Sequence, residues 1–308
     1  MNENDSNIIV LERIVKNYNS LKALDGVTLK VKRGEMYGLI GPDGAGKTTL
    51  IRIMLGLIKA DSGNCWIKDF DIRKEKEKTK LITGYMSQRV SLYEDLTVEE
   101  NMRFFSDLFK VPHPVKAERI EKLLQFSRLS PFRKRKSREL SGGMKKKLAL
   151  SCTLIHTPEI LFLDEPTTGV DPVSRREFWN ILRSLLKERV TIFITTPYMD
   201  EAEYCDRISF IQGGKITATG KPEEVKDLYP YDLFEIRTVL LSGVPGVIKD
   251  FKEVKSIQIF GDSLHVSFKK GAFSEKEIEK ILYKRGFEKI YLKKIKPGIG
   301  DVFLYLMG

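Results

Sequence analysis

The chain has 308 residues, of which 42% are hydrophobic and 31% are charged, and its formal net charge is +11. This composition predicts a globular protein with one large domain and a smaller one, and no stretch approaches the roughly 20 apolar residues of a membrane-spanning helix. The N-terminus lacks a secretory pattern, and the cysteines, Cys65, Cys152 and Cys205, are too few and scattered for a disulfide framework. These features favour a cytoplasmic protein, and the positive charge alone does not identify a partner.

The first informative stretch is GPDGAGKTT, residues 41–49, which lies between the strand-like run MYGLI and the helix-like run LIRIMLGLI. A glycine-rich loop in this context is typical of the phosphate-binding motif G-x-x-x-x-G-K-[ST]. Its glycines let the backbone wrap around phosphate oxygens, and the helix N-terminus directs N–H groups at them. We expect Lys47 to neutralise phosphate charge and Thr48 to ligate Mg²⁺. The expected nucleotide contacts in this loop are Gly41, Asp43, Gly44, Ala45, Gly46, Lys47, Thr48 and Thr49.

A second phosphate site is predicted farther along the chain. Residues 98–132 are roughly helical in character, and ELSGGMKKKLALSCTLI, residues 139–155, reads as a helix capped by Ser141. Gly142 and Gly143 leave backbone N–H groups free at its N-terminus. Because the helical segment separates this turn from the first loop, we expect two chains to face each other head to tail, each completing the other's nucleotide site. The basic cluster RKRKSR, residues 133–138, is interpreted as solvated surface.

Two adjacent carboxylates follow a buried-strand pattern in PEILFLDEP, residues 158–166. By itself, an Asp-Glu pair after an apolar run is more often a helix cap or a surface turn. Beside a phosphate loop, the same pair is expected at the carboxyl end of a parallel strand, where metal and nucleotide meet. Asp164 is then predicted to hold Mg²⁺, and Glu165 to act as the general base on water.

The last part of the chain has a different pattern. The stretch TATGKPEEVK is interpreted as a turn and a short helix that close the first domain. After it, strand and helix patterns alternate as βαββαβ, with a hairpin at Gly261-Asp262 and a capping box formed by Ser274 and Glu277. This order is that of a ferredoxin-like α+β fold. We expect a packing or dimer-stabilising appendage rather than a ligand sensor.

Five motifs together resemble the ordered motif set of ATP-binding cassette (ABC) proteins over about residues 8–221: GPDGAGKTT, Gln88 after GYMS, LSGGM, ILFLDEP and the TTGVDP loop with Asp171. The resemblance implies a P-loop NTPase cassette over residues 1–229 with an α/β core, an antiparallel β subdomain, and a helical subdomain over about 92–157. Residues 230–308 would form the small α+β domain. Two such cassettes would sandwich two ATP molecules with Mg²⁺.

The resemblance also assigns roles to single residues. Tyr18 looks like the aromatic side chain that stacks on adenine, although a core aromatic in an amphipathic strand is the alternative. Gln88 resembles the residue that contacts Mg²⁺ and senses the γ-phosphate, and Asp171 the residue at the dimer seam. The segment SLYEDLTVEENMRFF resembles the surface that receives a membrane subunit, although Phe104 and Phe105 fit a helix core equally well.

The sequence departs from the family pattern at one catalytic position. ABC proteins usually carry a histidine after the strand that ends in Thr-Thr, and here Pro197 follows VTIFITT. Proline offers no side-chain donor and no N–H, so we expect slow hydrolysis, or a second cassette chain that supplies a complete site. Asp43 and Lys146 also depart from the common residues, which are Asn and Gln. The charge of Asp43 would weaken triphosphate binding unless a base pairs with it.

The sequence of the segment SLYEDLTVEENMRFF is most similar to that of exporters of the ABC-2 drug-resistance type. The resemblance implies an ATPase that powers polytopic membrane subunits from the inner face of the cell membrane, as a homodimer or heterodimer. The alternatives are a soluble cassette ATPase working on ribosomes or DNA, and a low-turnover regulatory module that binds ATP. A single motif set without coiled-coil heptads argues against the first alternative, and no nucleic acid partner is expected. The resemblance implies that the membrane subunits select the transported substrate.

Overall fold

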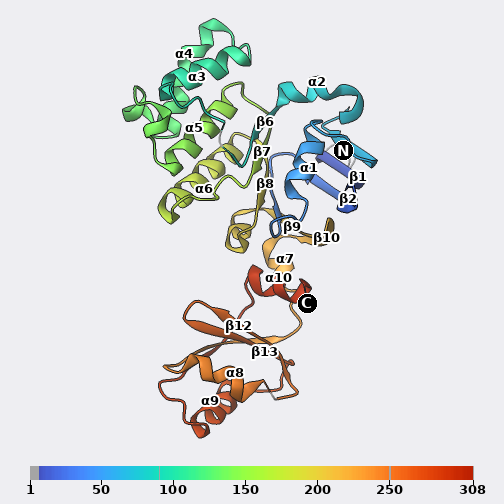
Figure 1. Cartoon of the computed structure of the whole chain (residues 1–308), viewed down its shortest axis with the longest axis vertical. Helices are drawn as coiled ribbons and strands as arrows, with labels where there is room; N and C mark the ends of the chain where they lie inside the picture. Colours follow the sequence, from blue (N-terminus) through green and yellow to red (C-terminus); the bar gives the residue numbers. More distant parts are fainter. Residues whose placement is uncertain (1–6, 90, 250, 308) are drawn as a thin grey trace. The chain divides into compact units, whose positions relative to one another are not determined.

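The computed structural model describes residues 7–89, 91–249 and 251–307. The chain divides into two compact units, Met1–Pro222 and Glu223–Gly308, which we call the cassette unit and the C-terminal unit (Figure 1). The predicted domain boundary at Tyr229 lies inside the C-terminal unit. Tyr229 belongs there because its hydroxyl bonds to Ser267 and its ring packs edge-on against Tyr305.

A six-stranded sheet with the order β10-β9-β3-β8-β7-β6 forms the centre of the cassette unit. Its strands are β3 (Met36–Ile40), β6 (Thr83–Met86), β7 (Ile160–Asp164), β8 (Thr191–Thr196), β9 (Arg207–Gln212) and β10 (Lys215–Gly220). The neighbours from β9 to β6 are parallel, and every residue of β3, β7 and β8 is buried, as in sheets covered on both faces. The stretch TATG, predicted as a turn, instead belongs to β10, because it extends the sheet by antiparallel pairing with β9.

An antiparallel subdomain with the strand order β2-β1-β4-β5 lies at the N-terminus (Figure 1). Its elements are β1 (Asn7–Tyr18), β2 (Leu21–Lys32), β4 (Ser62–Ile67), β5 (Phe70–Asp71) and α2 (Ile72–Ile82). One buried apolar cluster joins this subdomain to the central sheet and to α1 (Lys47–Met54). Helix α1 ends earlier than the run LIRIMLGLI suggested, because Gly56 adopts the left-handed conformation (φ 65°) that commonly terminates helices.

The helical subdomain contains α3 (Val98–Leu108), α4 (His113–Phe126) and α5 (Gly142–Leu154), packed around a separate apolar cluster. Helix α6 (Pro172–Lys187) follows β7 in the core, and short 3₁₀ turns cover 130–132, 137–139 and 199–204. The RKRKSR cluster is more than solvated surface. Arg133 bonds to Glu99 (2.9 Å) and Glu121 (3.1 Å), and the side-chain hydrogen bonds from Arg133 and Arg103 lower the pKa of Glu99 to about 2. This cluster therefore fastens the segment before α5 to α3 and α4.

The C-terminal unit has the ferredoxin-like topology that the sequence predicted. Helix α7 (Pro222–Lys226) leads into it, and a 3₁₀ turn covers 241–243. The sheet order β12-β13-β11-β14, with antiparallel neighbours, is that of a βαββαβ unit. The elements are β11 (Asp232–Arg237), α8 (Val244–Ile248), β12 (Val254–Phe260), β13 (Ser263–Phe268), α9 (Glu275–Lys284), β14 (Tyr291–Ile295) and α10 (Ile299–Met307). The Ser274–Glu277 capping box is present.

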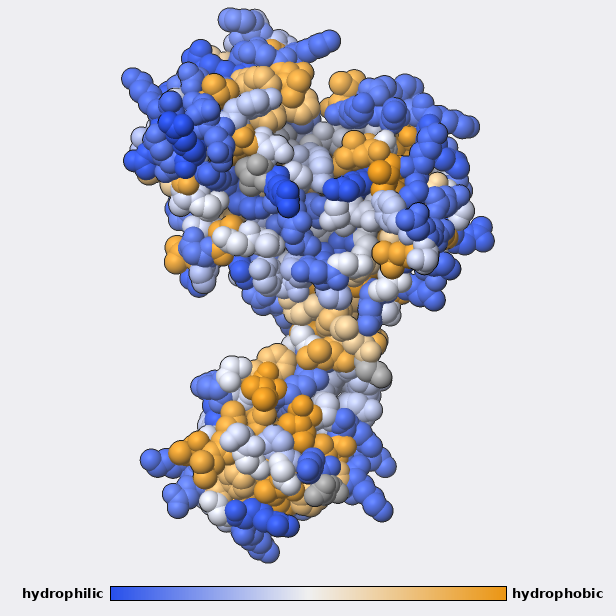
Figure 2. Space-filling model, in the orientation of Figure 1, coloured by the Kyte–Doolittle hydropathy of each residue, from blue (hydrophilic) through white to orange (hydrophobic). Residues whose placement is uncertain are grey.

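The surface of the C-terminal unit is partly apolar. Figure 2 shows a broad hydrophobic area on the visible face of this unit. Exposed apolar side chains of this unit include Leu240, Ile259 and Met307. A cavity beside α9, lined by Phe251 and Phe268, holds only about 10 Å³ and is too small for a ligand. An exposed apolar surface is the kind that packs against another protein, and the packing or dimer-stabilising role of this unit stays a prediction.

Candidate functional site

The glycine-rich loop connects β3 to α1, as predicted. Gly46, the residue before α1, has φ 105° in the left-handed region, and a Cβ at this position would meet the backbone oxygen of Ala23 at 2.5 Å. Only glycine fits both constraints without strain. The loop therefore turns closely past β2, and the N-terminus of α1 is left to face a ligand.

Lys47 is fixed inside this loop, with only 3% of its surface exposed. Its Nζ donates to the backbone oxygens of Gly41 (2.8 Å) and Pro42 (2.9 Å) and forms an ion pair with Glu165 Oε1 (3.0 Å). A buried ammonium needs such partners because desolvation of an isolated charge is costly. To bind phosphate oxygens, Lys47 Nζ would therefore have to exchange one of these three partners for them.

The predicted acidic pair lies at the carboxyl end of β7, beside the loop. Asp164 Oδ1 accepts hydrogen bonds from Thr48 Oγ1 (3.1 Å) and Thr195 Oγ1 (2.8 Å). Glu165 is 6% exposed and adopts φ 48°, a conformation that is costly for a residue with a side chain. Its backbone N–H donates to Thr195 O (3.1 Å), which fixes it against the end of β8. Thr195 was not predicted, although its place at a strand end was a usable signal.

Gln88 joins the same group from the other side. Its Nε2 donates to Glu165 Oε2 (2.9 Å), and its backbone oxygen accepts from Lys146 Nζ (2.9 Å). Lys146 is 7% exposed. Burial lowers the pKa of Lys146, while the nearby Glu165 and Asp164 carboxylates act in the opposite direction. Lys146 therefore ties α5 of the helical subdomain to the segment that carries Gln88. The sequence marked it only as a departure from the common glutamine.

Replacing Lys146 by methionine is expected to lower ATP turnover by about three- to tenfold, because the Gln88 carbonyl loses its donor and Gln88 is less firmly held against Glu165. Nucleotide affinity should change by less than about twofold, since Lys146 does not line the nucleotide cavity. Lys146→Gln keeps a donor without the charge and should recover most of the loss. Turnover of Lys146→Met equal to that of the unmodified chain would contradict this role.

A cavity of about 280 Å³ lies beside these groups. It is lined by Tyr18, Leu21, Ala23, Gly44, Gly46, Lys47, Thr48, Thr49 and Glu165. Tyr18 is 44% exposed at the end of β1, so the alternative of a core aromatic is wrong. An exposed ring at one end and a phosphate loop at the other match the two ends of a nucleotide.

Asp43 is exposed, and no ion pair of Asp43 occurs within residues 7–89, 91–249 and 251–307. The basic partner that would offset its charge beside a triphosphate is therefore not found among these residues.

The second predicted phosphate site lies elsewhere in the chain. Ser141 caps α5, where its Oγ accepts from the Met144 N–H (3.3 Å), and Ser141 and Gly142 are exposed. A Cβ on Gly143 would meet Ser174 at 2.5 Å, so the N-termini of α5 and α6 pack closely. Ser141, Gly142, Gly143 and Asp171 are all outside the cavity lining. One chain therefore does not bring its two phosphate sites together.

Asp171 is exposed and caps α6, accepting from the Ser174 N–H (2.9 Å). This backbone bond lowers the pKa of Asp171 and keeps its carboxylate charged. Ser174 thus contacts both the Asp171 loop and the Gly143 turn. The two elements predicted to reach a neighbouring chain form one surface of the cassette unit.

Pro197 follows the end of β8, and the next element, the 3₁₀ turn over 199–204, carries a buried carboxylate. Glu201 has no exposed surface and accepts hydrogen bonds from Thr167 (2.6 Å) and Thr196 (2.5 Å). Burial raises the pKa of Glu201. This contact, which the sequence did not reveal, joins the turn at Pro197 to the loop after Glu165.

None of the histidines replaces the missing donor at Pro197. His113 begins α4 in the helical subdomain, and His265 belongs to the C-terminal unit. His156 contacts the Thr83 carbonyl (3.0 Å) at the start of β6. Pro197 follows the end of β8, so His156 lies at the opposite end of these parallel strands.

The donor set fits MgATP. A hydroxyl and a carboxylate, Thr48 and Asp164, meet at the mouth of the phosphate loop, and Mg²⁺ shared with phosphates is typically held by one or two protein ligands. No cluster of three or more His, Cys, Asp or Glu side chains suited to a metal occurs among the residues that the structure describes.

Comparison with known proteins identifies the family. The ABC transporter family model matches residues 24–168. The daunorubicin resistance ATP-binding protein DrrA3 of Streptomyces coeruleorubidus is 33% identical over 305 residues, which cover 97% of this chain and 96% of DrrA3. This chain belongs to the ABC transporter family of ATP-binding cassettes. The probable multidrug ABC transporter ATP-binding protein YbhF of Escherichia coli K12 is 43% identical to this ABC chain. The match covers 71% of this chain and only 38% of the length of YbhF.

Solved cassettes share the fold of this ABC chain. The cbiO1 protein of Clostridium perfringens, part of the ABC transporter complex cbiONQ, has a TM-score of 0.68 at 29% identity, over 72% of this chain and 92% of that one. The dimeric bacterial ABC transporter cassette MJ0796 has a TM-score of 0.63 at 26% identity. The match covers 69% of this chain and 98% of MJ0796. The predicted P-loop cassette fold is confirmed, and the chain is a nucleotide-binding cassette of the P-loop ATPase type.

Proposed function

We propose that this ABC chain is the ATP-hydrolysing subunit of an exporter and powers transport through separate membrane subunits. The observation that carries the proposal is the contact of Lys47, Gln88 and Asp164–Glu165 at one edge of the parallel sheet, beside a cavity of about 280 Å³. The names of the relatives, which refer to daunorubicin resistance, multidrug transport and Nod factor export, support the direction of transport.

Each residue has a defined task in the proposed reaction. Thr48 and Asp164 would hold the Mg²⁺ of MgATP, which would supply positive charge to neutralise the phosphate oxygens. Lys47 leaves Glu165 and pairs with the β and γ phosphates, which frees the Glu165 carboxylate to orient a water and accept its proton. Gln88 remains within hydrogen-bond distance of Glu165 and reports on the γ position to the helical subdomain through Lys146. Tyr18 stacks on the adenine ring.

A second cassette completes each site in this proposal. Ser141, Gly142 and Gly143 offer a helix N-terminus to the γ-phosphate held by the neighbouring chain, and Asp171 reaches across the same seam. The exposure of Ser141, Gly142 and Asp171 on this chain supports that arrangement, as does the existence of a dimeric cassette among the similar structures. The neighbour is an identical chain or a second ABC chain that carries a histidine at the position corresponding to Pro197.

The membrane partner is proposed to bind near Gln88. A hollow of about 200 Å³ lies there, lined in part by Met86, Leu92 and Phe105, and it suits an apolar segment of a membrane subunit. The Phe104 ring packs against the Tyr93 ring, and 36% of Phe104 remains exposed. Among the described residues, no helix combines the length and apolar character that crossing a bilayer demands. We place the chain at the cytoplasmic face of the membrane, held there by its partner.

Pro197 is the one observation that favours a second candidate function, a regulatory module that binds ATP and turns it over slowly. The site then acts as a gate, and closure on ATP matters more than hydrolysis. No observation favours a ribosome- or DNA-associated ATPase.

Co-purification from detergent-solubilised membranes of the source organism tests the proposal. A tagged chain is expected to retain a polytopic membrane protein, and Phe104→Asp should lose that protein while keeping nucleotide binding. Leu57→Asp, which alters a 56% exposed side chain in another subdomain, serves as the control and should retain it. Recovery of ribosomes instead of a membrane protein would overturn the proposal.

A further inference from the structure

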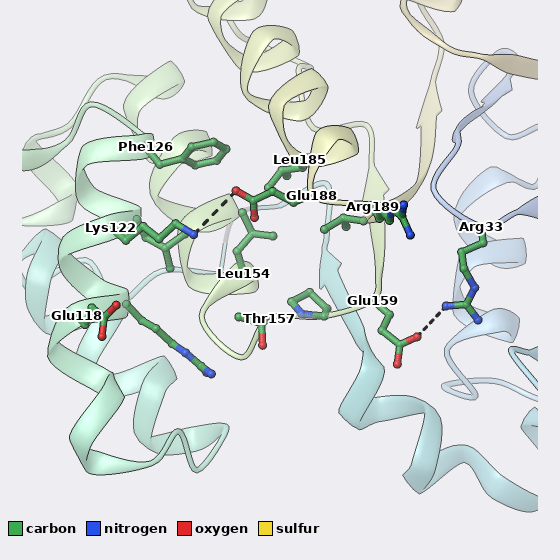
Figure 3. A pocket seen from close by; sticks show the side chains of 14 residues that line it. Arg33, Glu118, Lys122, Phe126, Leu154, Thr157, Glu159, Leu185, Glu188 and Arg189 are labelled. Carbon is green, nitrogen blue, oxygen red and sulfur yellow. Dashed lines mark hydrogen bonds and ion pairs between the residues drawn. The ribbon is translucent and has the colours of Figure 1, made fainter.

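A second cavity of the cassette unit, larger than the nucleotide cavity, lies away from the nucleotide site. It is a groove of about 490 Å³ between α4 and the edge of the central sheet where β7 begins (Figure 3). Pro158 and Glu159, which precede β7, line the groove, whereas Asp164 ends the same strand at the nucleotide site. The groove and the nucleotide site therefore lie at opposite ends of strand β7. The volume is in the range of pockets that bind small organic molecules.

The floor of the groove is apolar. Helix α4 contributes Leu123 and Phe126, the end of α5 contributes Leu154, and the end of α6 and the turn after it contribute Leu185 and Val190. Figure 3 shows side chains of α4 on one side of the groove and those of the α5–β7 and α6–β8 connections on the other. Leu154 and Leu185 are 6% and 5% exposed, so the floor is fixed by the core. Such a floor suits a hydrocarbon chain.

The rim of the groove carries an excess of positive charge. Its charged side chains are Arg33, Arg119, Lys122, Arg189, Glu118, Glu159 and Glu188. Two of the three carboxylates are already paired: Glu188 lies 3.9 Å from Lys122, and Glu159 is shared by Arg33 (3.1 Å) and by Lys68 (2.9 Å), which lies outside the lining.

Two arginines and the Glu118 carboxylate remain, so the unpaired rim groups keep one net positive charge. Arg119 donates to the Ile155 carbonyl (3.3 Å), and neither Arg119 nor Arg189 forms an ion pair with another described residue. Both belong to the groove lining, and they enter it from different elements, α4 and the turn after α6. A guanidinium without a carboxylate partner is suited to a carboxylate or phosphate group.

We propose that this groove binds an amphipathic anion, a molecule with an unbranched hydrocarbon body and one carboxylate or phosphate head. The body lies along Leu123, Phe126, Leu154 and Leu185, and the head pairs with Arg119 or Arg189. Such a ligand bridges α4 of the helical subdomain and the core of the cassette unit, so it stiffens the connection between them. Binding at this site does not depend on the proposed ATPase activity.

Titration with decanoate, decyl phosphate and decanol, each below its micelle concentration, tests the proposal on the whole chain without nucleotide. Methyl NMR signals of Leu123, Leu154, Leu185 and Val190 are expected to shift, with the anions bound at least about tenfold more tightly than decanol. Octanoate should bind about 16-fold more weakly than decanoate, because each buried methylene contributes about fourfold. Comparing decanoate with decyl phosphate shows which head group the arginines prefer.

Arg119→Gln with Arg189→Gln should reduce anion affinity about tenfold and leave decanol binding unchanged. Lys47→Ala, at the nucleotide loop, is the matched control and should bind decanoate like the unmodified chain. The proposal is overturned if decanol binds as tightly as decanoate, if the shifted methyl groups lie outside the groove, or if the double variant keeps full anion affinity. An unchanged thermal melting curve for that variant ensures that a loss reflects binding and not folding.

Discussion

Glu165→Gln is expected to lower the rate of ATP hydrolysis by about 10²- to 10⁴-fold while MgATP still binds. Glutamine has nearly the size of glutamate and can accept the hydrogen bond from Gln88, but it cannot take a proton from water. The change also removes the ion pair between Glu165 and Lys47. This pair is buried, because the Lys47 side chain is 3% exposed and the Glu165 side chain 7%. Because Lys47 no longer has to leave a carboxylate to bind phosphate, affinity for MgATP should rise.

Phosphate release under saturating MgATP measures the first effect, and titration with a fluorescent ATP analogue measures the second. Glu77→Gln is the matched control, since the same substitution occurs there at a side chain that is 73% exposed. Glu77→Gln should leave both quantities unchanged. Turnover by Glu165→Gln within about threefold of the unmodified chain would show that Glu165 is not the general base.

Pro197→His is expected to raise turnover by about 10- to 100-fold. Loss of one preorganised donor to a developing charge typically lowers a rate by about 10²- to 10³-fold, and restoring it in a turn adapted to proline should recover part of that factor. The position is favourable because Pro197 directly follows β8, whose last residues Thr195 and Thr196 are fixed by Asp164 and Glu201. An imidazole there would start from a rigid base.

Pro197→Ala separates the added donor from the loss of the proline ring, and its turnover should match that of the unmodified chain. Adding Glu165→Gln to Pro197→His should return turnover to the low level of Glu165→Gln alone. If Pro197→His leaves phosphate release unchanged while nucleotide binding is intact, the absence of a histidine does not limit this site. The chain then fits the interpretation as a regulatory module more closely.

The nucleotide loop and its acidic partners could be predicted from the sequence because each is a local pattern. The run MYGLI coincides with β3, and ILFLD coincides with β7, since fully buried parallel strands appear as continuous apolar runs. The contact between Lys47 and Glu165 then follows from the fold, because β3, β8 and β7 are adjacent and parallel. Alternating patterns likewise predicted the ferredoxin-like topology of the C-terminal unit.

The features that were missed depend on contacts between distant parts of the chain. Lys146 stands in a helix with several lysines, and only the packing of α5 shows which of them reaches Gln88. Glu201 looked like one of several acidic residues in MDEAE, although its side chain is buried and bonds to Thr196 just before Pro197. The groove has walls from α4, α5 and α6, which no local pattern links. The extent of the cassette unit was overestimated for the same reason, since Tyr229 packs with Tyr305.

The central claim is that a nucleotide is held between the glycine-rich loop of one chain and the Ser141–Gly143 turn of another. Sedimentation of the Glu165→Gln chain, alone and with any second ABC chain that co-purifies with it, tests this claim most directly. The account predicts a dimer in MgATP, monomers in MgADP, and monomers in MgATP when Ser141→Arg is added to each chain's own turn. A Glu165→Gln chain that binds MgATP and nevertheless stays monomeric, both alone and with such a second chain, would contradict it.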